Sequence, residues 1–186
     1  PIILRLSDNF LKKRAASMYI VFGGFLRNKD KLIDIGAGSC HVASLLKAKG
    51  FDVTAVDIND KSFVEGIRPL IYDGEKLPFA DEAFDVSLLL TVLHHTSQPE
   101  KILQEASRVS HTVILMEDIV EGRMHKFATG FIDSLLNLEF WGHPHSNKTD
   151  KEWRRVFKNL NLEVVNVVYH KSLGVMKHAT YILKKI

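Results

Sequence analysis

The stretch from Lys31 to Leu46, KLIDIGAGSCHVASLL, constrains the fold of this chain more than any other. A short apolar run, broken only by Asp34, changes abruptly into a glycine-rich turn, and the turn opens a segment with apolar residues at helical spacing. This order predicts a strand, a loop and a helix. Gly36 and Gly38 lack a Cβ, so they can adopt positive φ or let a ligand approach the backbone closely.

A turn of this kind marks the place where open α/β sheets bind nucleotide-like ligands, because the amides that open the helix point into the space beyond the strand. Asp57 follows Gly38 by nineteen residues and ends a second apolar run. A carboxylate there can accept two hydrogen bonds from a ribose diol. The glycine turn alone is weak evidence for such a site, and Asp57 has a simpler alternative role as a helix cap before Asn59.

Length and composition bound the class of protein. A chain of 186 residues, 46% hydrophobic and 25% charged, is expected to form one ordinary globular domain. A net charge of +3 is too small to argue for nucleic acid as a partner. A single cysteine, Cys40, excludes an internal disulfide and favours a reducing, cytoplasmic location. No apolar run approaches the roughly 18 residues that span a bilayer, so no transmembrane segment is expected.

Hydrophobic periodicity predicts strands and helices in alternation along the chain. The expected helices cover about residues 7–26, 40–49, 59–66, 98–109 and 150–160. The expected strands cover about residues 31–35, 51–57, 69–72, 84–90, 112–116, 162–169 and 179–183. Five alternations in a row predict a doubly wound parallel sheet. On the first helix the polar face carries Lys12, Lys13 and Arg14, which either face solvent or contact an anionic surface or acidic substrate.

With the glycine turn, Asp57, the Asp73-Gly74 loop, the FDVSLLL strand and the closing strand pair in this order, the chain resembles the class I S-adenosylmethionine-dependent methyltransferases over nearly its whole length. It is most similar to the branch that methylates small molecules and quinone precursors, with its acid-x-Gly-x-Gly turn and segments like LPFADEAFDV and LHH. The resemblance implies a Rossmann-like sheet of about seven strands, mostly parallel with an antiparallel C-terminal strand, and helices on both faces. Cys40 stands where the family usually has a third glycine.

The resemblance also implies which residues hold S-adenosylmethionine, whose product would be S-adenosylhomocysteine. They are, at the methionine end, Asp34, Gly36, Ala37, Gly38, Leu90 and Thr91; at the ribose, Asp57; and at the adenine, Ile58, Asp73 and Gly74. A dinucleotide-binding motif requires no acid at the end of the third strand, so Asp73 favours S-adenosylmethionine over a dinucleotide.

Few catalytic side chains are needed, since a sulfonium is already an activated methyl donor. A base is required only if the acceptor must lose a proton, and a histidine with a pKa of about 6.5 can take one at neutral pH. The candidates are His94, His95, His143 and His145, with Tyr19 and Glu117 as weaker ones. The first two histidines could instead hydrogen-bond the backbone. The spacing of the last two resembles a metal site, but no nearby carboxylate or cysteine completes it, so no metal is expected.

We expect one methyltransferase-like domain over residues 1–186, with a helical cap at 1–30, a cofactor-binding half at 31–118, an acceptor-site insertion at 119–150, and a helix plus strand pair at 151–186. Aromatic residues in the insertion are more often core than pocket, yet they would suit an apolar acceptor such as a quinone, polyketide or lipid-like molecule. The residues assigned to acceptor binding are Phe127, Phe131, Trp141 and His143.

The sequence therefore predicts an S-adenosylmethionine-dependent methyltransferase that methylates a small-molecule acceptor by in-line displacement. A nicotinamide-dependent oxidoreductase is disfavoured by the missing third glycine and the closing strand pair. A methyltransferase-like domain that binds its ligand without catalysis, or that serves a partner, stays open as an alternative.

Overall fold

The computed structural model describes residues 2–120, 148–172 and 176–186. In these residues seven strands form one sheet in the order β3-β2-β1-β4-β5-β7-β6. The strands are β1 (Lys31–Ile35), β2 (Asp52–Asp57), β3 (Leu70–Ile71), β4 (Phe84–Leu90), β5 (Ser110–Asp118), β6 (Leu162–Ser172) and β7 (Met176–Lys185). The helices are α1 (Ile2–Phe22), α2 (His41–Ala48), α3 (Pro99–Val109) and α5 (Asp150–Asn159), with short 3-10 turns η1 (Gly23–Phe25) and η2 (Leu93–His95).

The five strands from β1 through β5 are paired with their neighbours in parallel, and the last strand, β7, runs in the opposite direction. β7 runs antiparallel to both of its neighbours, β5 and β6, and lies between them. This confirms the predicted sheet of seven strands with an antiparallel closing strand. The FDVSLLL run forms β4 at the centre of the sheet, where six of its seven residues are buried, as expected of a parallel strand covered on both faces.

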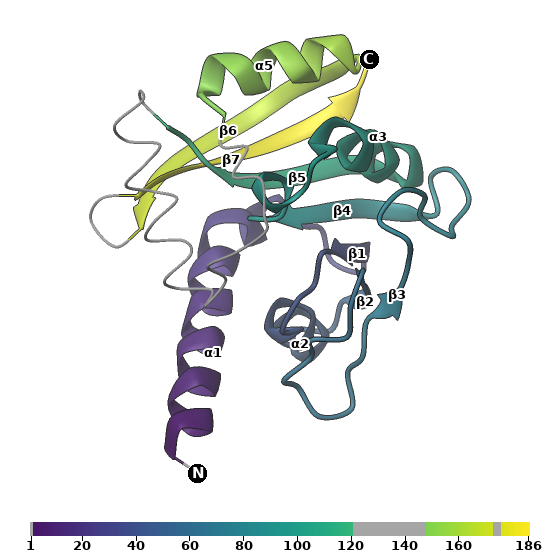
Figure 1. The fold of residues 1–186 in the computed structure, drawn as a ribbon. Helices are drawn as coiled ribbons and strands as arrows, with labels where there is room; N and C mark the ends of the chain where they lie inside the picture. The colour runs from purple at the N-terminus through teal and green to yellow at the C-terminus, as the bar shows by residue number, and fades with distance from the viewer. Residues whose placement is uncertain (1, 121–147, 173–175) are drawn as a thin grey trace.

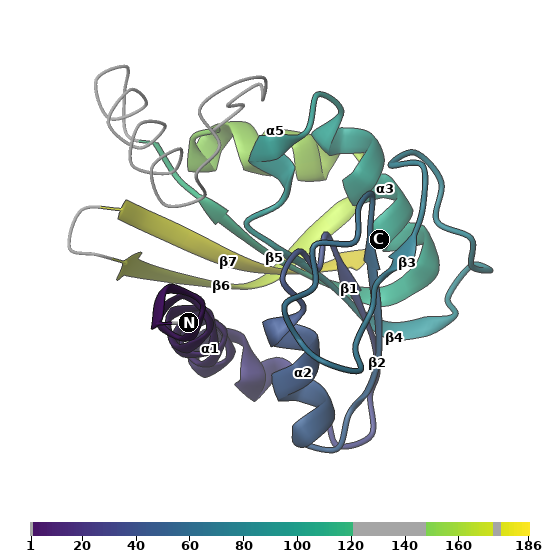
Figure 2. The same cartoon turned by 60° about the horizontal axis from the view of Figure 1, so that its bottom comes forward.

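Helices cover both faces of the sheet. Figures 1 and 2 show α3 and α5 on one face and α1 and α2 on the other. Alternate residues of the strands point to opposite faces, so β5 sends Leu115 into the core below α3 and α5, and Ile114 into the core below α1 and α2. Thr149 begins α5 with a capping box: it accepts from the Glu152 amide, and the Glu152 carboxylate accepts from the Thr149 amide.

Two helix predictions differ from the structure. The first helix begins at Ile2 rather than at Ser7, and it ends at Phe22 rather than at about residue 26. The helix predicted for residues 59–66 is wrong, since these residues form a loop. Short polar side chains satisfy the backbone there: Asp60 accepts from the Ser62 amide, and the Ser62 hydroxyl donates to the Ile67 carbonyl. Such local bonds compete with helix formation.

Candidate functional site

The site lies where the chain order reverses in the sheet. From β1 the chain runs outward to β2 and β3, whereas β4 returns to the other side of β1 and leads to β5. The loops that leave the carboxyl ends of β1 and β4 therefore diverge and open a crevice between them. Ligands of open α/β sheets bind at this switch point.

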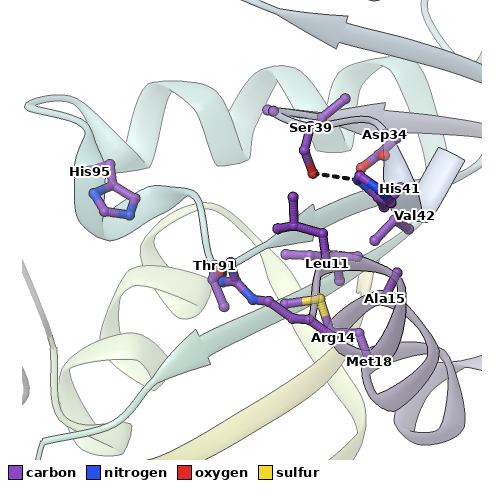
Figure 3. Close-up of a pocket in the computed structure, with 14 residues that line it drawn as sticks. Leu11, Arg14, Ala15, Met18, Asp34, Ser39, His41, Val42, Thr91 and His95 are labelled. Atoms are coloured by element: carbon purple, nitrogen blue, oxygen red, sulfur yellow. Dashed lines mark hydrogen bonds between the residues drawn. The ribbon is translucent and has the colours of Figure 1, made fainter. Parts of the chain in front are cut away.

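A cavity of about 160 Å³ occupies this crevice (Figure 3). It is lined by Leu11, Arg14, Ala15, Met18, Asp34, Gly36, Ala37, Gly38, Ser39, His41, Val42, Leu90, Thr91 and His95. All six residues that the sequence assigns to the methionine end of the cofactor are among them. The cavity also takes side chains from α1, which the sequence did not assign to the cofactor site.

Asp34 is the buried charge of this cavity. Its side chain lies at the carboxyl end of β1, only 3% of the residue is exposed, and its Oδ2 atom has no hydrogen-bond partner among the described residues. Burial, together with the nearby carboxylate of Asp57, raises the Asp34 pKa to about 7, against a hydrogen bond from the Ala43 amide. A cationic group placed in the cavity would stabilise the ionised carboxylate.

The glycine turn needs left-handed backbone at three positions. Gly36 has a φ of 74°, Gly38 of 49° and Cys40 of 60°. Cys40, which directly precedes α2, therefore occupies a backbone conformation that favours glycine. Its amide donates to the Ala37 carbonyl at 2.8 Å and the side chain is fully buried, so a small thiol is accommodated at a position that glycine would occupy without strain.

A methyl group at position 36 should disable this turn. In Gly36→Ala the new Cβ would lie 2.7 Å from both γ carbons of Val92. We expect a loss of about 2–4 kcal/mol of unfolding free energy, because a left-handed alanine and a clash with a stiff β-branched side chain add together. Urea unfolding followed by circular dichroism measures the loss.

Gly38→Ala is the matched control, since Gly38 also has positive φ but the nearest atom to its added Cβ lies 4.0 Å away. It should cost about 1 kcal/mol. Adding Val92→Ala to Gly36→Ala should recover part of the larger loss. Equal losses in the two glycine variants would contradict the role of Val92.

Asp57, at the end of β2, supports the turn from the neighbouring strand. Its Oδ2 accepts from the Gly38 amide at 2.8 Å, and its Oδ1 accepts from the Asn59 amide at 3.1 Å. No helix follows it, so the alternative role as a helix cap is wrong. Each carboxylate oxygen can accept more than one hydrogen bond, which leaves acceptor capacity for a diol at the edge of the cavity.

The residues assigned to adenine lie beyond the cavity, on the ends of β2 and β3. Ile58 is 54% exposed, and a Cβ added to Gly74 would lie 3.2 Å from its side chain, so these two residues are neighbours. Asp73 is exposed, and its Oδ1 accepts from the amides of Glu75 and Lys76. These two bonds hold the Asp73 pKa below its usual range. An exposed apolar side chain beside a glycine offers a flat surface for a planar ring.

Of the four candidate histidines, the structure describes His94 and His95, which lie in η2 shortly after β4, and of these two only His95 lines the cavity. His94 is buried, with its Nδ1 2.6 Å from Glu117 Oε2. The other oxygen of Glu117 accepts from the amides of Val92 and Leu93 at 2.9 and 2.6 Å. Glu117 therefore holds the backbone of Val92 and Leu93 and the His94 side chain in position after β4.

The remaining predicted residues divide into two groups. Tyr19 does not line the cavity, but packs edge-on against Phe22 on α1. Residues outside the described part of the chain are Phe127, Phe131, Trp141, His143 and His145. Over the described ranges, no cluster of three or more histidine, cysteine, aspartate or glutamate side chains could hold a metal ion. No helix in those ranges is both long and apolar enough to cross a membrane.

A second histidine–carboxylate pair, not identified from the sequence, lies at the end of β5. Asp118 Oδ1 is 2.7 Å from His178 Nδ1 of β7, and both side chains are buried. The His170 ring of β6 stacks on the His178 ring with centroids 5.0 Å apart. Burial and the neighbouring His178 lower the pKa of His170. Asp118 follows Met116 on the same face of β5, and the Met116 carbonyl accepts from the Thr91 amide at 2.7 Å.

The glycine turn, the acid after it and the switch-point cavity define an α/β protein with a site for a nucleoside-like ligand. Residues 33–113 match the family model described as a methyltransferase domain. An uncharacterized protein of Methanocaldococcus jannaschii is 30% identical over 165 residues, which cover 85% of this chain and 71% of that protein. YcgJ of Bacillus subtilis, described as an uncharacterized methyltransferase, is 31% identical over 94 residues, covering 45% of this chain and 37% of YcgJ.

Solved structures show the same fold. The YcgJ structure superposes with a TM-score of 0.68 at 16% identity, covering 93% of this chain and 98% of that chain. A SAM-dependent methyltransferase of Methanosarcina mazei superposes with a TM-score of 0.70 at 17% identity, covering 89% and 97%. Residues 33–113 of this chain thus match a methyltransferase domain, and the chain has the fold of the solved SAM-dependent methyltransferase from Methanosarcina mazei.

Proposed function

We propose that this protein binds S-adenosylmethionine in the switch-point cavity and transfers its methyl group to a small-molecule acceptor. The observation that carries this proposal is the buried Oδ2 of Asp34 beside the glycine turn, which has no hydrogen-bond partner in the part of the chain that the structure describes. An ionised carboxylate in that position needs a cation, and the methionyl ammonium supplies one. The cavity of about 160 Å³ suits this amino-acid end, with the adenosine extending along the surface between Asp57 and Gly74.

Bound S-adenosylmethionine would supply an activated methyl group, because the sulfur leaves as a neutral thioether. In that chemistry the bond from sulfur to the methyl carbon would break with its electron pair left on sulfur, and the acceptor nucleophile would form the new bond. The chain's own residues act by orientation and by exclusion of water, with Leu90 and Thr91 beside the methionyl group and α1 covering the cavity.

An acceptor hydroxyl or amine must also lose a proton. His95 borders the cavity, and the Asp118–His178 pair lies one strand further along the same edge of the sheet. Either histidine is a candidate general base for this step.

Calorimetry with S-adenosylmethionine, S-adenosylhomocysteine and NAD tests the proposal. We expect the first two to bind and NAD not to bind. Asp57→Ala should weaken binding by at least about tenfold, because it removes both the turn support and the ribose acceptor. Asp52→Ala, at the exposed opposite end of β2, is the matched control and should leave affinity unchanged.

Incubation with radiolabelled methyl donor and fractionated cell metabolites then separates an enzyme from a binding domain. Label that moves into a small molecule supports the proposal. Ligand binding with no transfer to any fraction would indicate the non-catalytic alternative, and binding of NAD alone would indicate an oxidoreductase.

A further inference from the structure

The pair formed by Asp118 and His178 lies on the same face of the sheet as the cavity. Leu90, which lines the cavity, and Met116, its partner across the β4–β5 pairing, belong to the same buried cluster. Asp118 follows Met116 by two residues, so it shares this face and lies about 7 Å further toward the carboxyl end of β5. His178 pairs with Asp118 from β7, the next strand of the sheet (Figure 1). The pair therefore continues the face of the cavity, on the two strands that follow β4.

Asp118 orients the His178 ring. The Oδ1 atom of Asp118 lies 2.7 Å from Nδ1 of His178, and the side chains of the two residues are 3% and 11% exposed. Since Nδ1 is buried, the exposed part of the ring lies away from that nitrogen. A carboxylate this close to Nδ1 favours the proton on that nitrogen, so the neutral ring has its free electron pair on Nε2. A histidine held by a buried carboxylate in this way is arranged as a general base.

The neighbouring histidine on β6 does not compete for this carboxylate. His170 lies opposite His178 in the β6–β7 pairing, and the two rings stack with an interplanar angle of 11° and centroids 5.0 Å apart. Burial and the adjacent His178 lower the pKa of His170, against the attraction of Asp118. His170 therefore stays uncharged while His178 holds a proton, and the three side chains take up one proton rather than two.

The proposed orientation of the cofactor leaves this side of the sheet for the acceptor. The methionyl group would lie beside the glycine turn and Leu90, and the adenosine would extend over the ends of β2 and β3. On the other side of β4 the sheet continues with β5 and β7. An acceptor that approaches the methyl group over these two strands would meet the Asp118–His178 pair.

An oriented base distinguishes hydroxyl acceptors from amine acceptors. A neutral amine attacks a methyl group with its own lone pair and can lose its proton afterwards, whereas a hydroxyl is a weak nucleophile until a base removes its proton. We infer that His178, oriented by Asp118, is the general base of this protein and that the acceptor group is a hydroxyl. This inference rests on the proposed function and chooses His178 over His95.

The proton transfer requires no further reactant. The O–H bond of the acceptor breaks, the proton passes to Nε2 of His178, and the electron pair stays on the oxygen, which then bonds to the methyl carbon. The buried carboxylate of Asp118 stabilises the imidazolium that forms. The ring returns its proton to solvent after the product leaves.

The pH dependence of methyl transfer tests the inference, with saturating S-adenosylmethionine and the metabolite fraction that takes up label. The wild-type rate should rise with pH as the base loses its proton, and then level off. His178→Gln should lower the rate about 100-fold or more and remove this rise, because its amide can donate to Asp118 but cannot take up a proton. His170→Phe, which keeps a ring in the stack, should retain the rise. His111→Gln, at the exposed opposite end of β5, is the matched control and should keep both rate and profile.

Two measurements separate this role from a structural one. S-adenosylhomocysteine binding to His178→Gln, measured by calorimetry, should stay within about twofold of the wild type. Asp118→Asn should slow transfer by at least about tenfold and keep a pH-dependent rate, since the base is still present without its charged partner. A wild-type rate in Asp118→Asn, or an equal loss of binding and transfer in His178→Gln, would overturn the inference.

Other outcomes also decide it. A rise that persists in His178→Gln but disappears in His95→Gln would assign the base to His95 instead. A labelled product that carries the methyl group on nitrogen would overturn the hydroxyl assignment. Absence of transfer by the wild-type protein to any fraction would refute the proposed function, and this inference with it.

Discussion

Glu117→Ala is expected to lower the unfolding free energy by about 3–5 kcal/mol, the largest stability loss that we predict for a single side chain near the site. Glu117 is 1% exposed and accepts from two backbone amides and from the His94 ring. Removing this carboxylate leaves all three donors without the acceptor that they share. For a domain of this size, a loss of that order lowers Tm by about 10 °C, which differential scanning calorimetry measures.

Glu117→Gln separates the contribution of the negative charge from that of the hydrogen-bond acceptor. A glutamine keeps an oxygen for the amides of Val92 and Leu93, and His94 can accept from its amide group by changing tautomer. This variant should lose less than half as much as Glu117→Ala. Glu163→Ala, on the exposed face of β6, should stay within about 0.5 kcal/mol of the wild type. A loss below about 1 kcal/mol in Glu117→Ala would contradict the role assigned to this carboxylate.

Asp34→Asn is expected to weaken S-adenosylmethionine binding by about 100-fold or more at pH 8, because the methionyl ammonium loses its charged partner in a buried site. The Asp34 pKa of about 7 adds a pH dependence to the wild type. Below that value the free protein holds a protonated carboxyl, which must ionise before it pairs with the ammonium. Affinity should fall about tenfold between pH 8 and pH 6. In Asp34→Asn this dependence should disappear.

Calorimetry at pH 6 in buffers with different ionisation enthalpies should show proton release on binding to the wild type and none on binding to Asp34→Asn. An affinity that is equal at pH 6 and pH 8 in the wild type would show that Asp34 does not meet the cation.

The same carboxyl should make the ligand-free protein less stable at high pH. Its pKa is raised from 3.8 to about 7 in the folded state, so the folded protein binds more protons between these values. The stability that protonation contributes is complete below pH 4 and is lost as the pH rises through about 7. At pH 8 and without ligand, the unfolding free energy of Asp34→Asn should therefore exceed that of the wild type by about 2 kcal/mol, even though asparagine still buries a polar amide. Binding would thus depend on a residue that destabilises the empty site.

Local patterns in the sequence determined most of the fold. The apolar runs of β1 and β4 and the glycine turn between β1 and α2 each depend on neighbouring residues, so their spacing predicts them. The third position of the turn follows the same local rule: Cys40 adopts the left-handed backbone that the resemblance, with its usual glycine there, leads one to expect. The failed helix at residues 59–66 shows the limit of this reasoning, because periodicity does not record that Ser62 and Asp60 bond the backbone instead.

Only the tertiary structure decided which polar side chains contact one another. Arg14 and Thr91 are 77 residues apart, and His94 and Glu117 are 23 apart, yet each pair is in contact. Sequence alone left Arg14 on a solvated or anion-binding face, and it left Glu117 as a weak candidate base. The physical reason is that helix and strand periods depend on local spacing, whereas contacts between elements depend on how the strands order in the sheet and which face each helix covers.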